Sequence, residues 1–156
     1  MSNCSDFCNY PRNPKEAELS NPNLQNVFAG NPLDLGTAVI GGNGPNIVFD
    51  NAGNLFLDRG LYLVSYSTSA VWTTTPYGTN EAIIALFLRN VLLTDSVSTV
   101  QVPPQPINVG LRPFKLNLSK TILVKVRLDN SSLRLVNQST AVMGFEHTVL
   151  TIVKLD

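Results

Sequence analysis

The stretch Gly60–Trp72, which reads Gly-Leu-Tyr-Leu-Val-Ser-Tyr-Ser-Thr-Ser-Ala-Val-Trp, decides the fold. It has no proline, no charge and no internal glycine, and it is rich in residue types that suit a half-buried pleated surface. Side chains alternate between the two faces of a strand, so one face here is large and amphipathic and the other is rich in small hydroxyls. We predict a long central strand whose first face lies in the core and whose second face packs on another chain. The core face holds Tyr62, Val64, Tyr66, Thr68, Ala70 and Trp72, and the second face holds Leu61, Leu63, Ser65, Ser67, Ser69 and Val71.

The composition indicates one domain that hides apolar surface. The 156 residues are enough for one substantial core. Charged residues make up 14% of the chain, below the roughly 25% that is usual, and 11 basic residues balance 11 acidic ones. A chain without net charge has no field that attracts nucleic acid, so no nucleic-acid partner is expected. Few charges together with 44% hydrophobic residues favour burial between subunits.

The first 31 residues are predicted to be a flexible tail in front of a domain at residues 32–156. They are rich in asparagine and proline, and proline blocks regular backbone ladders. Within the tail, Lys15–Leu19 is predicted to form one helical turn and Leu24–Ala29 a first short strand. The chain begins without the basic segment and apolar run of a Sec-type signal peptide, and it has no apolar run of about 18 residues. We therefore expect no Sec-type leader and no membrane insertion.

Short β-prone runs separated by turn residues fill the rest of the chain. Asn46–Phe49 and Asn54–Leu57 flank a four-residue connection that ends in glycine, which predicts a hairpin. Glu81–Leu88 is apolar on both faces, and its length favours a strand over a helix. About ten strands with frequent turns and no convincing helix predict an all-β antiparallel sandwich or barrel. The other predicted strands are Thr37–Ile40, Val91–Leu93, Ser96–Val102, Ile107–Leu116, Thr121–Leu128, Leu133–Val136 and Phe145–Leu155.

Three segments of this pattern resemble the tumour necrosis factor and complement-head superfamily. Gly60-Leu61-Tyr62 resembles its Gly-x-Tyr strand, and residues 143–155 resemble its closing strand. Pro113–Lys120 followed by Ile122–Val126 is similar to its late strand, tight turn and next strand. The resemblance spans about residues 46–155 and implies a ten-stranded antiparallel jelly roll that assembles into a trimer. It also implies that four side chains face the threefold axis, namely Leu63, Ser65, Val149 and Val153.

Within that superfamily the sequence is similar to spore exosporium proteins of bacilli and clostridia. The shared features are a short cysteine-containing tail, a Gly-Leu-Tyr-x-x-Ser-Tyr strand and an end on the last strand. The sequence lacks collagen-like repeats, so it resembles the basal-layer kind. The resemblance implies a homotrimeric structural protein of the spore surface, in the exosporium or coat, whose tail contacts other spore-surface proteins. Cys4 and Cys8, the only cysteines, are either cross-links in an oxidising layer or idle thiols.

Few residues are candidates for reaction chemistry. His147 is the only histidine, so neither a metal centre built from several histidines nor a serine–histidine–aspartate triad is expected. Glu146 is predicted to point to the opposite face of the strand, so it forms no catalytic pair with His147. Asp50-Asn51 and Asp129-Asn130 could each hold calcium, but aspartate and asparagine also form turns, which explains both pairs. We predict no enzyme activity, no metal site and no cofactor.

A carbohydrate- or receptor-binding module of the same fold is the alternative hypothesis. Trp72 and Tyr77 lie in or beside the predicted loop Thr73–Asn80, where an aromatic ring could stack on a sugar. A single aromatic residue beside a loop also serves packing. A structural protein is expected to be a trimer, whereas a binding module is expected to lose its ligand in the variant Trp72→Ala.

Overall fold

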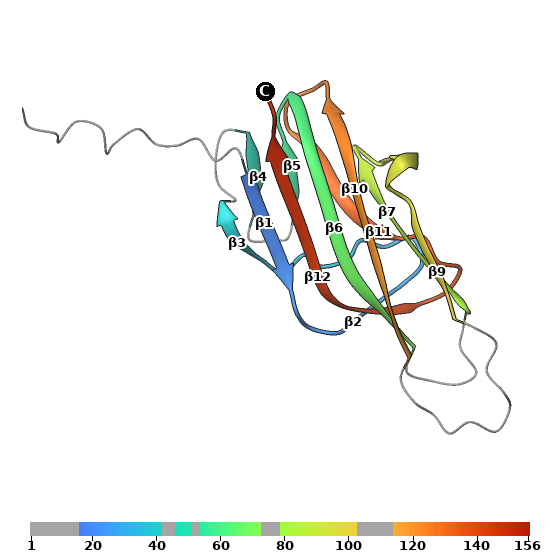
Figure 1. Cartoon of the computed structure of the whole chain (residues 1–156). Coiled ribbons are helices and arrows are strands. Elements are labelled where there is room, and N and C mark those ends of the chain that lie inside the picture. Colours follow the sequence, from blue (N-terminus) through green and yellow to red (C-terminus); the bar gives the residue numbers. More distant parts are fainter. Residues whose placement is uncertain (1–15, 42–45, 51–53, 73–78, 103–113) are drawn as a thin grey trace, which may run out of the picture.

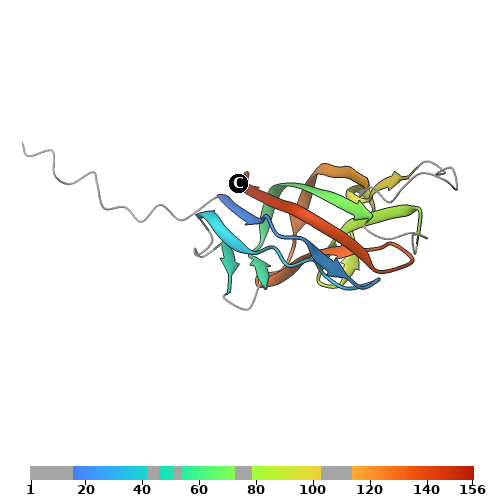
Figure 2. The ribbon, with the colours of Figure 1, turned by 90° about the horizontal axis from the view of Figure 1, so that it is seen from below.

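The computed structural model describes residues 16–41, 46–50, 54–72, 79–102 and 114–156, and these residues form two antiparallel sheets packed face to face (Figure 1). Seen from below, the strands lie in two layers (Figure 2). The predicted all-β antiparallel sandwich is therefore confirmed. The described residues contain twelve strands, against the ten of the jelly roll that the resemblance implies, and one short 3-10 helix, η1 (Thr94–Ser96).

One sheet, which we call the long sheet, has the strand order β10-β6-β12-β1-β3, and β2 pairs with β12. Its strands β6 and β10 have 13 residues each and β12 has 12. β12 therefore lies in the middle of this sheet, between β6 and β1 (Figure 1). The bounds are β1 (Glu16–Asn21), β2 (Gln25–Val27), β3 (Thr37–Gly41), β6 (Gly60–Trp72), β10 (Phe114–Val126) and β12 (Met143–Lys154).

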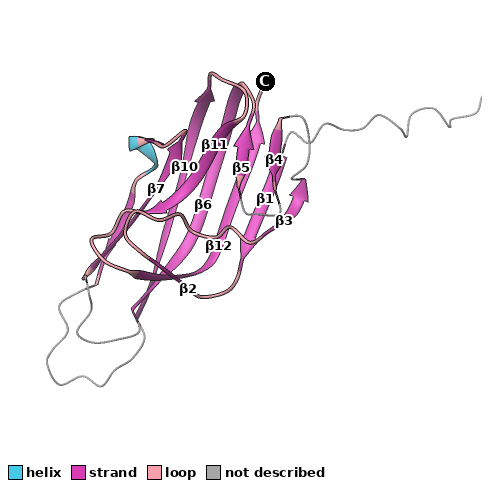
Figure 3. Ribbon diagram, turned by 180° about the vertical axis from the view of Figure 1, so that it is seen from behind, coloured by secondary structure: helices cyan, strands magenta, loops and turns pink. Residues whose placement is uncertain are grey.

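The second sheet, the short sheet, has the strand order β4-β5-β11-β7-β8, and β9 pairs with β7. It is seen best from behind (Figure 3). β4 and β5 pair antiparallel, which confirms the predicted hairpin strands. The bounds are β4 (Ile47–Phe49), β5 (Leu55–Leu57), β7 (Glu81–Leu88), β8 (Val91–Leu92), β9 (Ser98–Gln101) and β11 (Ser131–Asn137).

The core lies between the two sheets, and β6 supplies one side of it. The bounds of β6 coincide with the predicted strand, and its predicted core face is confirmed because all six side chains are at most 3% exposed. The uninterrupted run of β-prone residues explains this agreement. Phe145 and Leu150 of β12 extend the same side of the core. From the short sheet the core receives Ile47, Leu55, Leu57, Ile84, Leu86, Leu133 and Leu135.

The sandwich begins earlier in the chain than the sequence predicts. β1 pairs antiparallel with both β12 and β3, so residues from Glu16 onward belong to the long sheet. The helical turn predicted at Lys15–Leu19 is wrong for the described residues, because Ala17 and Leu19 point into the core at 1% and 0% exposure. This strand has only six residues and two apolar positions, which is too short a pattern to reveal its period.

β10 corrects a second expectation. The tight turn predicted between Pro113–Lys120 and Ile122–Val126 is wrong, because one continuous strand pairs with β6 from Phe114 to Val126. Ser119, Lys120 and Thr121 look like turn residues because they are polar. Their polarity instead reflects exposure to solvent on an edge strand.

β12 contains a bulge that the sequence alternation does not predict. Its register with β6 shifts between Glu146 and Val149, and His147 has a positive φ of 51°. One extra residue in a strand reverses the faces of all residues beyond it. Simple alternation along the predicted strand Phe145–Leu155 would place Phe145, His147 and Val149 on one face, but Phe145 is buried and Val149 lies on the opposite face.

Several predicted features lie outside the described residues. They are Cys4, Cys8 and Tyr77, together with residues 107–113 of the strand predicted at Ile107–Leu116.

Candidate assembly face

The side of the long sheet that points away from the core presents three rows of neighbouring side chains. The register of β10, β6, β12 and β1 sets these rows, because residues directly opposite in an antiparallel pair point to the same face. We call the β10, β6 and β12 members the outward face. From β10 to β1 the rows read Leu123, Leu63, Val153 and Glu16; then Thr121, Ser65, Thr151 and Glu18; then Ser119, Ser67, Val149 and Ser20.

The outward face carries no charge among its nine residues. Leu63, on the inner strand β6, is 36% exposed, and its neighbour Leu123, on the edge strand β10, is 63% exposed. The Ser65 and Thr121 hydroxyls lie 2.9 Å apart and bond to each other. Five of the nine residues carry hydroxyls and four are apolar. The solvent face of an antiparallel sheet normally carries polar side chains, so the apolar row of Leu123, Leu63 and Val153 is the unusual part of this surface.

Charged residues border the outward face on three sides. At one end Lys125 of β10 lies beside Leu61 of β6. Along β1, Glu16 and Glu18 continue the first and second rows. At the opposite end the Lys115 ammonium contacts the Glu146 carboxylate at 2.5 Å.

The bulge in β12 places His147 beside that ion pair. The His147 Nε2 atom lies 3.9 Å from Glu146 Oε1, so the bulge brings together two side chains predicted to point apart. The His147 side chain is 68% exposed. Behind the bulge, the Thr68 hydroxyl donates to the Glu146 carbonyl at 3.1 Å and lies 2.8 Å from the Thr148 hydroxyl. The Thr68 hydroxyl thus satisfies the Glu146 carbonyl at the bulge. The proximity of His147 and Glu146 is therefore explained by the backbone geometry of the bulge.

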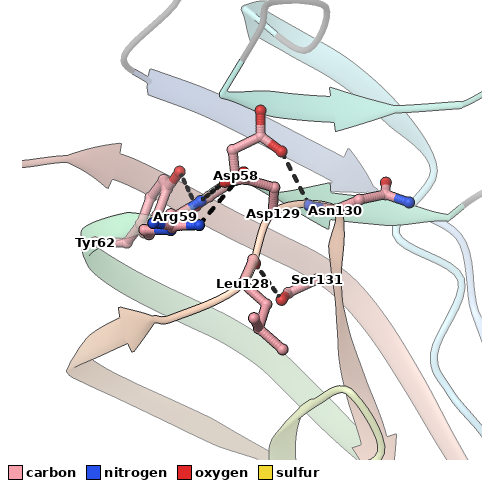
Figure 4. Close-up of polar contacts among 7 residues, drawn as sticks. All are labelled: Asp58, Arg59, Tyr62, Leu128, Asp129, Asn130 and Ser131. Carbon is pink, nitrogen blue, oxygen red and sulfur yellow. Dashed lines mark hydrogen bonds and ion pairs between the residues drawn. The ribbon is translucent and has the colours of Figure 1, made fainter.

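One end of the sandwich is held by two turns that bond to each other (Figure 4). The Arg59 N–H donates to the Asp129 carboxylate at 2.8 Å, and the Asn130 N–H donates to the Asp58 carboxylate at 3.0 Å. The carboxylate of Asp129, which was considered above as a calcium ligand, therefore accepts a hydrogen bond from the neighbouring turn. The Tyr62 hydroxyl donates to the Asp58 carbonyl at 2.8 Å in the same corner.

The two core tyrosines of β6 have perturbed acidity. Burial raises the pKa of Tyr62 to about 12, and the carboxylates of Asp58, Asp156 and Asp129 act in the same direction. Burial also raises the pKa of Tyr66 to about 12. The Tyr66 hydroxyl donates to the Ser96 carbonyl at 2.5 Å, which ties β6 to η1 across the sandwich. Both tyrosines therefore stay neutral and act as anchors rather than as acids or bases near neutral pH.

The predicted ligand residue Trp72 lies in the core. Its side chain is 3% exposed, and its indole N–H donates to the Thr79 carbonyl at 2.8 Å. A buried ring offers no face on which a sugar could stack. Its predicted companion Tyr77 lies outside the described residues, so the structure assembles no aromatic ligand site from this pair.

The structure brings together the four residues predicted to face a threefold axis. Leu63 and Val153 are direct neighbours in the first row, and Ser65 and Val149 lie in the second and third rows. Sequence reasoning missed the β10 members of the same face, chiefly Leu123 and Thr121. The alternation of Thr121–Leu128, which sets Leu123 apart from the buried Val124 and Val126, was the signal that could have identified Leu123.

Other surfaces offer less chemistry. A hollow of about 350 Å³ lies on the short sheet, and its ionisable lining residues are Asp34 and Arg134. In the part of the chain that the structure describes, no group of three or more histidine, cysteine, aspartate or glutamate side chains is placed to hold a metal ion. Nor does any helix in the described ranges have the length and apolar character needed to cross a membrane.

Comparison with known proteins identifies the architecture. No family model matches the sequence, and no curated protein does. Solved structures match over most of the chain. The Eiger tumour necrosis factor of S. frugiperda has a TM-score of 0.70 and 14% sequence identity, over 90% of this chain and 92% of that chain. The fold is that of a tumour-necrosis-factor-like jelly roll.

A second solved structure with a similar fold is a complement head domain. The globular domain of the zebrafish complement 1qA protein has a TM-score of 0.62 and 9% identity, over 90% of this chain and 97% of that chain. The TM-scores establish the jelly-roll architecture. At identities this low the function has to be argued from the residues of this chain.

Proposed function

We propose that the chain is a non-enzymatic structural module that assembles into a homotrimer through the outward face of its long sheet. The observation that carries the proposal is the face itself, which is uncharged and exposes the neighbouring Leu63 on β6 and Leu123 on the edge strand β10. Burial of such a surface against a second copy removes apolar area from water. The likeness to the tumour necrosis factor and complement-head folds supports a closed ring of three copies.

The size of the face sets a further condition. Three strands about 4.8 Å apart and three rows about 6.8 Å apart cover roughly 300 Å². A stable interface buries about 800 Å² on each partner, so the nine residues alone are too small a contact. The interface therefore extends over the borders of the face, onto β1 and the free edge of β10.

Light scattering after size exclusion tests the proposal. The unmodified chain is expected to elute with the mass of about three chains. The variant Leu63→Asp places a charge in the first row and is expected to elute as a folded monomer, because a buried unpaired carboxylate opposes assembly. Circular dichroism should show the same β-sheet spectrum for both proteins.

Val91→Asp is the matched control. Val91 is also an exposed apolar residue, at 65%, but it lies on β8 of the short sheet. This variant is expected to remain a trimer. A monomeric unmodified chain, or equal dissociation of both variants, would contradict assembly through the outward face.

We further propose that the trimer is a building block of a bacterial spore surface layer, in the exosporium or coat. Support comes from the sequence, through the Gly60–Tyr66 strand pattern and the two cysteines that precede the sandwich. Cys4 and Cys8 would link trimers to neighbouring spore-surface proteins by disulfides in an oxidising layer.

A non-reducing gel of material from spores tests this role. Ladders of high mass are expected for the unmodified protein, and they should vanish for the double variant Cys4→Ser with Cys8→Ser. A single band at the mass of one chain from the unmodified protein, without reductant, would contradict the cross-linking role.

A further inference from the structure

The borders of the outward face carry opposite charges on opposite sides. Lys125 lies on β10, which is the edge strand of the long sheet, and Glu16 and Glu18 lie on β1. Three strand spacings separate β10 from β1, about 14 Å, so these groups cannot pair within one chain. Among the described residues none of the three forms an ion pair, whereas Lys115 at the other end of β10 already contacts Glu146. Three charges thus remain available to another molecule.

Along the strands, Lys125 lies one row from Glu16 and two rows from Glu18. Glu16 lies in the same row as Leu123, and Lys125 lies two residues further along β10, about 6.8 Å away. Rotation about an axis that runs along the strands changes the lateral position of a residue but keeps its height. In a ring of identical chains around such an axis, the β10 edge of one copy therefore lies at the same height as the β1 region of the next. A lysine side chain is long enough to cover the offset to Glu16, whereas Glu18 lies about 13.6 Å from Lys125 along the strand and adds negative charge to the same border.

We propose that Lys125 of one chain pairs with Glu16 of the next chain, with Glu18 adding negative charge to the same border, so that the basic β10 edge of each copy lies on the acidic β1 border of its neighbour. This inference rests on the proposed trimer. It adds which two borders meet and what determines their pairing. Such an interface is heterologous, because each copy contributes a different border to each contact, and heterologous contacts are the ones that close into rings. Complementary charges set the register and the rate of such an association.

Charge reversal tests the pairing. Sedimentation at a series of concentrations gives the midpoint for trimer assembly. Glu16→Lys with Glu18→Lys is expected to raise this midpoint about tenfold, and Lys125→Glu is expected to raise it to a similar extent, because like charges then meet. The triple reversal, Glu16→Lys, Glu18→Lys and Lys125→Glu in one chain, restores opposite charges at every contact. Its midpoint should return close to that of the unmodified protein.

Arg134→Glu is the matched control for net charge. Arg134 is exposed on β11 of the short sheet and forms no ion pair among the described residues. Its reversal should leave the midpoint unchanged. If the unmodified chain is a trimer but the reversals on the two borders have no effect, or the triple reversal fails to restore assembly, the pairing is overturned while the trimer stands. If the unmodified chain is a monomer, the proposed trimer itself fails, and the pairing fails with it.

Discussion

The two faces of β6 lie in contrasting environments. Tyr62, Val64 and Thr68 point inward and are fully buried, whereas Leu63 and Ser65 point outward and remain partly exposed. Neighbouring residues of one strand therefore belong to different environments. The inward residues determine whether the sandwich forms, and the outward residues determine what the finished sandwich contacts.

The difference teaches that apolar character alone does not assign a residue to the core. Leu63 and Leu123 are as hydrophobic as the core leucines, but they are 36% and 63% exposed. Truncation of a core side chain removes transfer energy and leaves a cavity, whereas truncation of an outward side chain leaves no cavity in the monomer. The following predictions test this difference, and each is made in the Leu63→Asp background so that assembly does not enter the free energy of unfolding.

The largest effect is expected for Phe145→Ala. Phe145 is fully buried, so its truncation should lower the free energy of unfolding by about 3–5 kcal/mol. Urea unfolding followed by the fluorescence of Trp72, the only tryptophan, measures the change. Leu123→Ala on the outward face is the control, with an expected change within about 0.5 kcal/mol. Equal losses in both variants would remove the distinction between the faces.

Alkaline pH should act on the inward face through its tyrosines. The pKa of Tyr62 and of Tyr66 is about 12 in the folded chain, against about 10 in the unfolded chain. Below pH of about 10 both states keep the proton, so the contribution to stability is fully present. Between about pH 10 and pH 12 the tyrosines of the unfolded chain lose their protons, whereas those of the folded chain keep them. The free energy of unfolding therefore falls with rising pH, by on the order of 2 kcal/mol for each tyrosine.

Urea unfolding at several pH values checks this sign. Tyr62→Phe and Tyr66→Phe should each reduce the loss of stability between about pH 10 and 12, although each also removes one hydrogen bond at neutral pH. An unchanged pH dependence in both variants would show that these tyrosines ionise as freely in the folded chain as in the unfolded chain.

The buried hydroxyl pair of Thr68 and Thr148 should show a smaller effect. Thr68 donates to the Glu146 carbonyl, so Thr148 donates to Thr68. Thr68→Val leaves a buried hydroxyl and a carbonyl without a partner and should cost about 1–3 kcal/mol. The double variant Thr68→Val with Thr148→Val should cost less than the sum of the single variants. A strictly additive result would contradict their direct contact.

The smallest effect is expected for the corresponding pair on the outward face. Ser65 and Thr121 are also bonded, at 2.9 Å, but the contact is exposed and water can replace it. Ser65→Ala and Thr121→Ala should each change the free energy of unfolding by less than about 0.5 kcal/mol. A loss as large as that of Thr68→Val would show that this face contributes to the fold of the monomer.

Sequence periodicity predicts the parts of the fold where an uninterrupted apolar pattern is long. The bounds of β6 and β7 coincide with the predicted Gly60–Trp72 and Glu81–Leu88 because each run contains no proline or internal glycine. β1 was missed because its two buried positions are too few to define a period. The bulge at His147 was missed because its cause is tertiary, a buried hydroxyl and backbone network that includes Thr68 of another strand.

The candidate face was predictable only in part. Leu63 and Ser65 follow from alternation along one strand, and Val149 and Val153 entered through a family resemblance. Their arrangement in rows with Leu123 and Thr121 depends on the register of three strands, which a single sequence does not contain. The acidic border was hidden because Glu16 and Glu18 were assigned to a tail, although β1 places them beside β12.

The position of β12 has a consequence for how the protein is made. This strand is the last described element in the chain, yet it fills the centre of the long sheet and separates β6 from β1. A ribosome that has not yet released residues 143–154 holds a chain whose two halves of that sheet have nothing between them. The sandwich must therefore close after synthesis of these residues, through contacts of large sequence separation that form slowly. Until then Tyr62, Val64 and Tyr66 lack their β12 neighbours, so the nascent chain has an unpaired edge on β6 and exposed apolar side chains, which are the features that favour aggregation of incompletely folded chains.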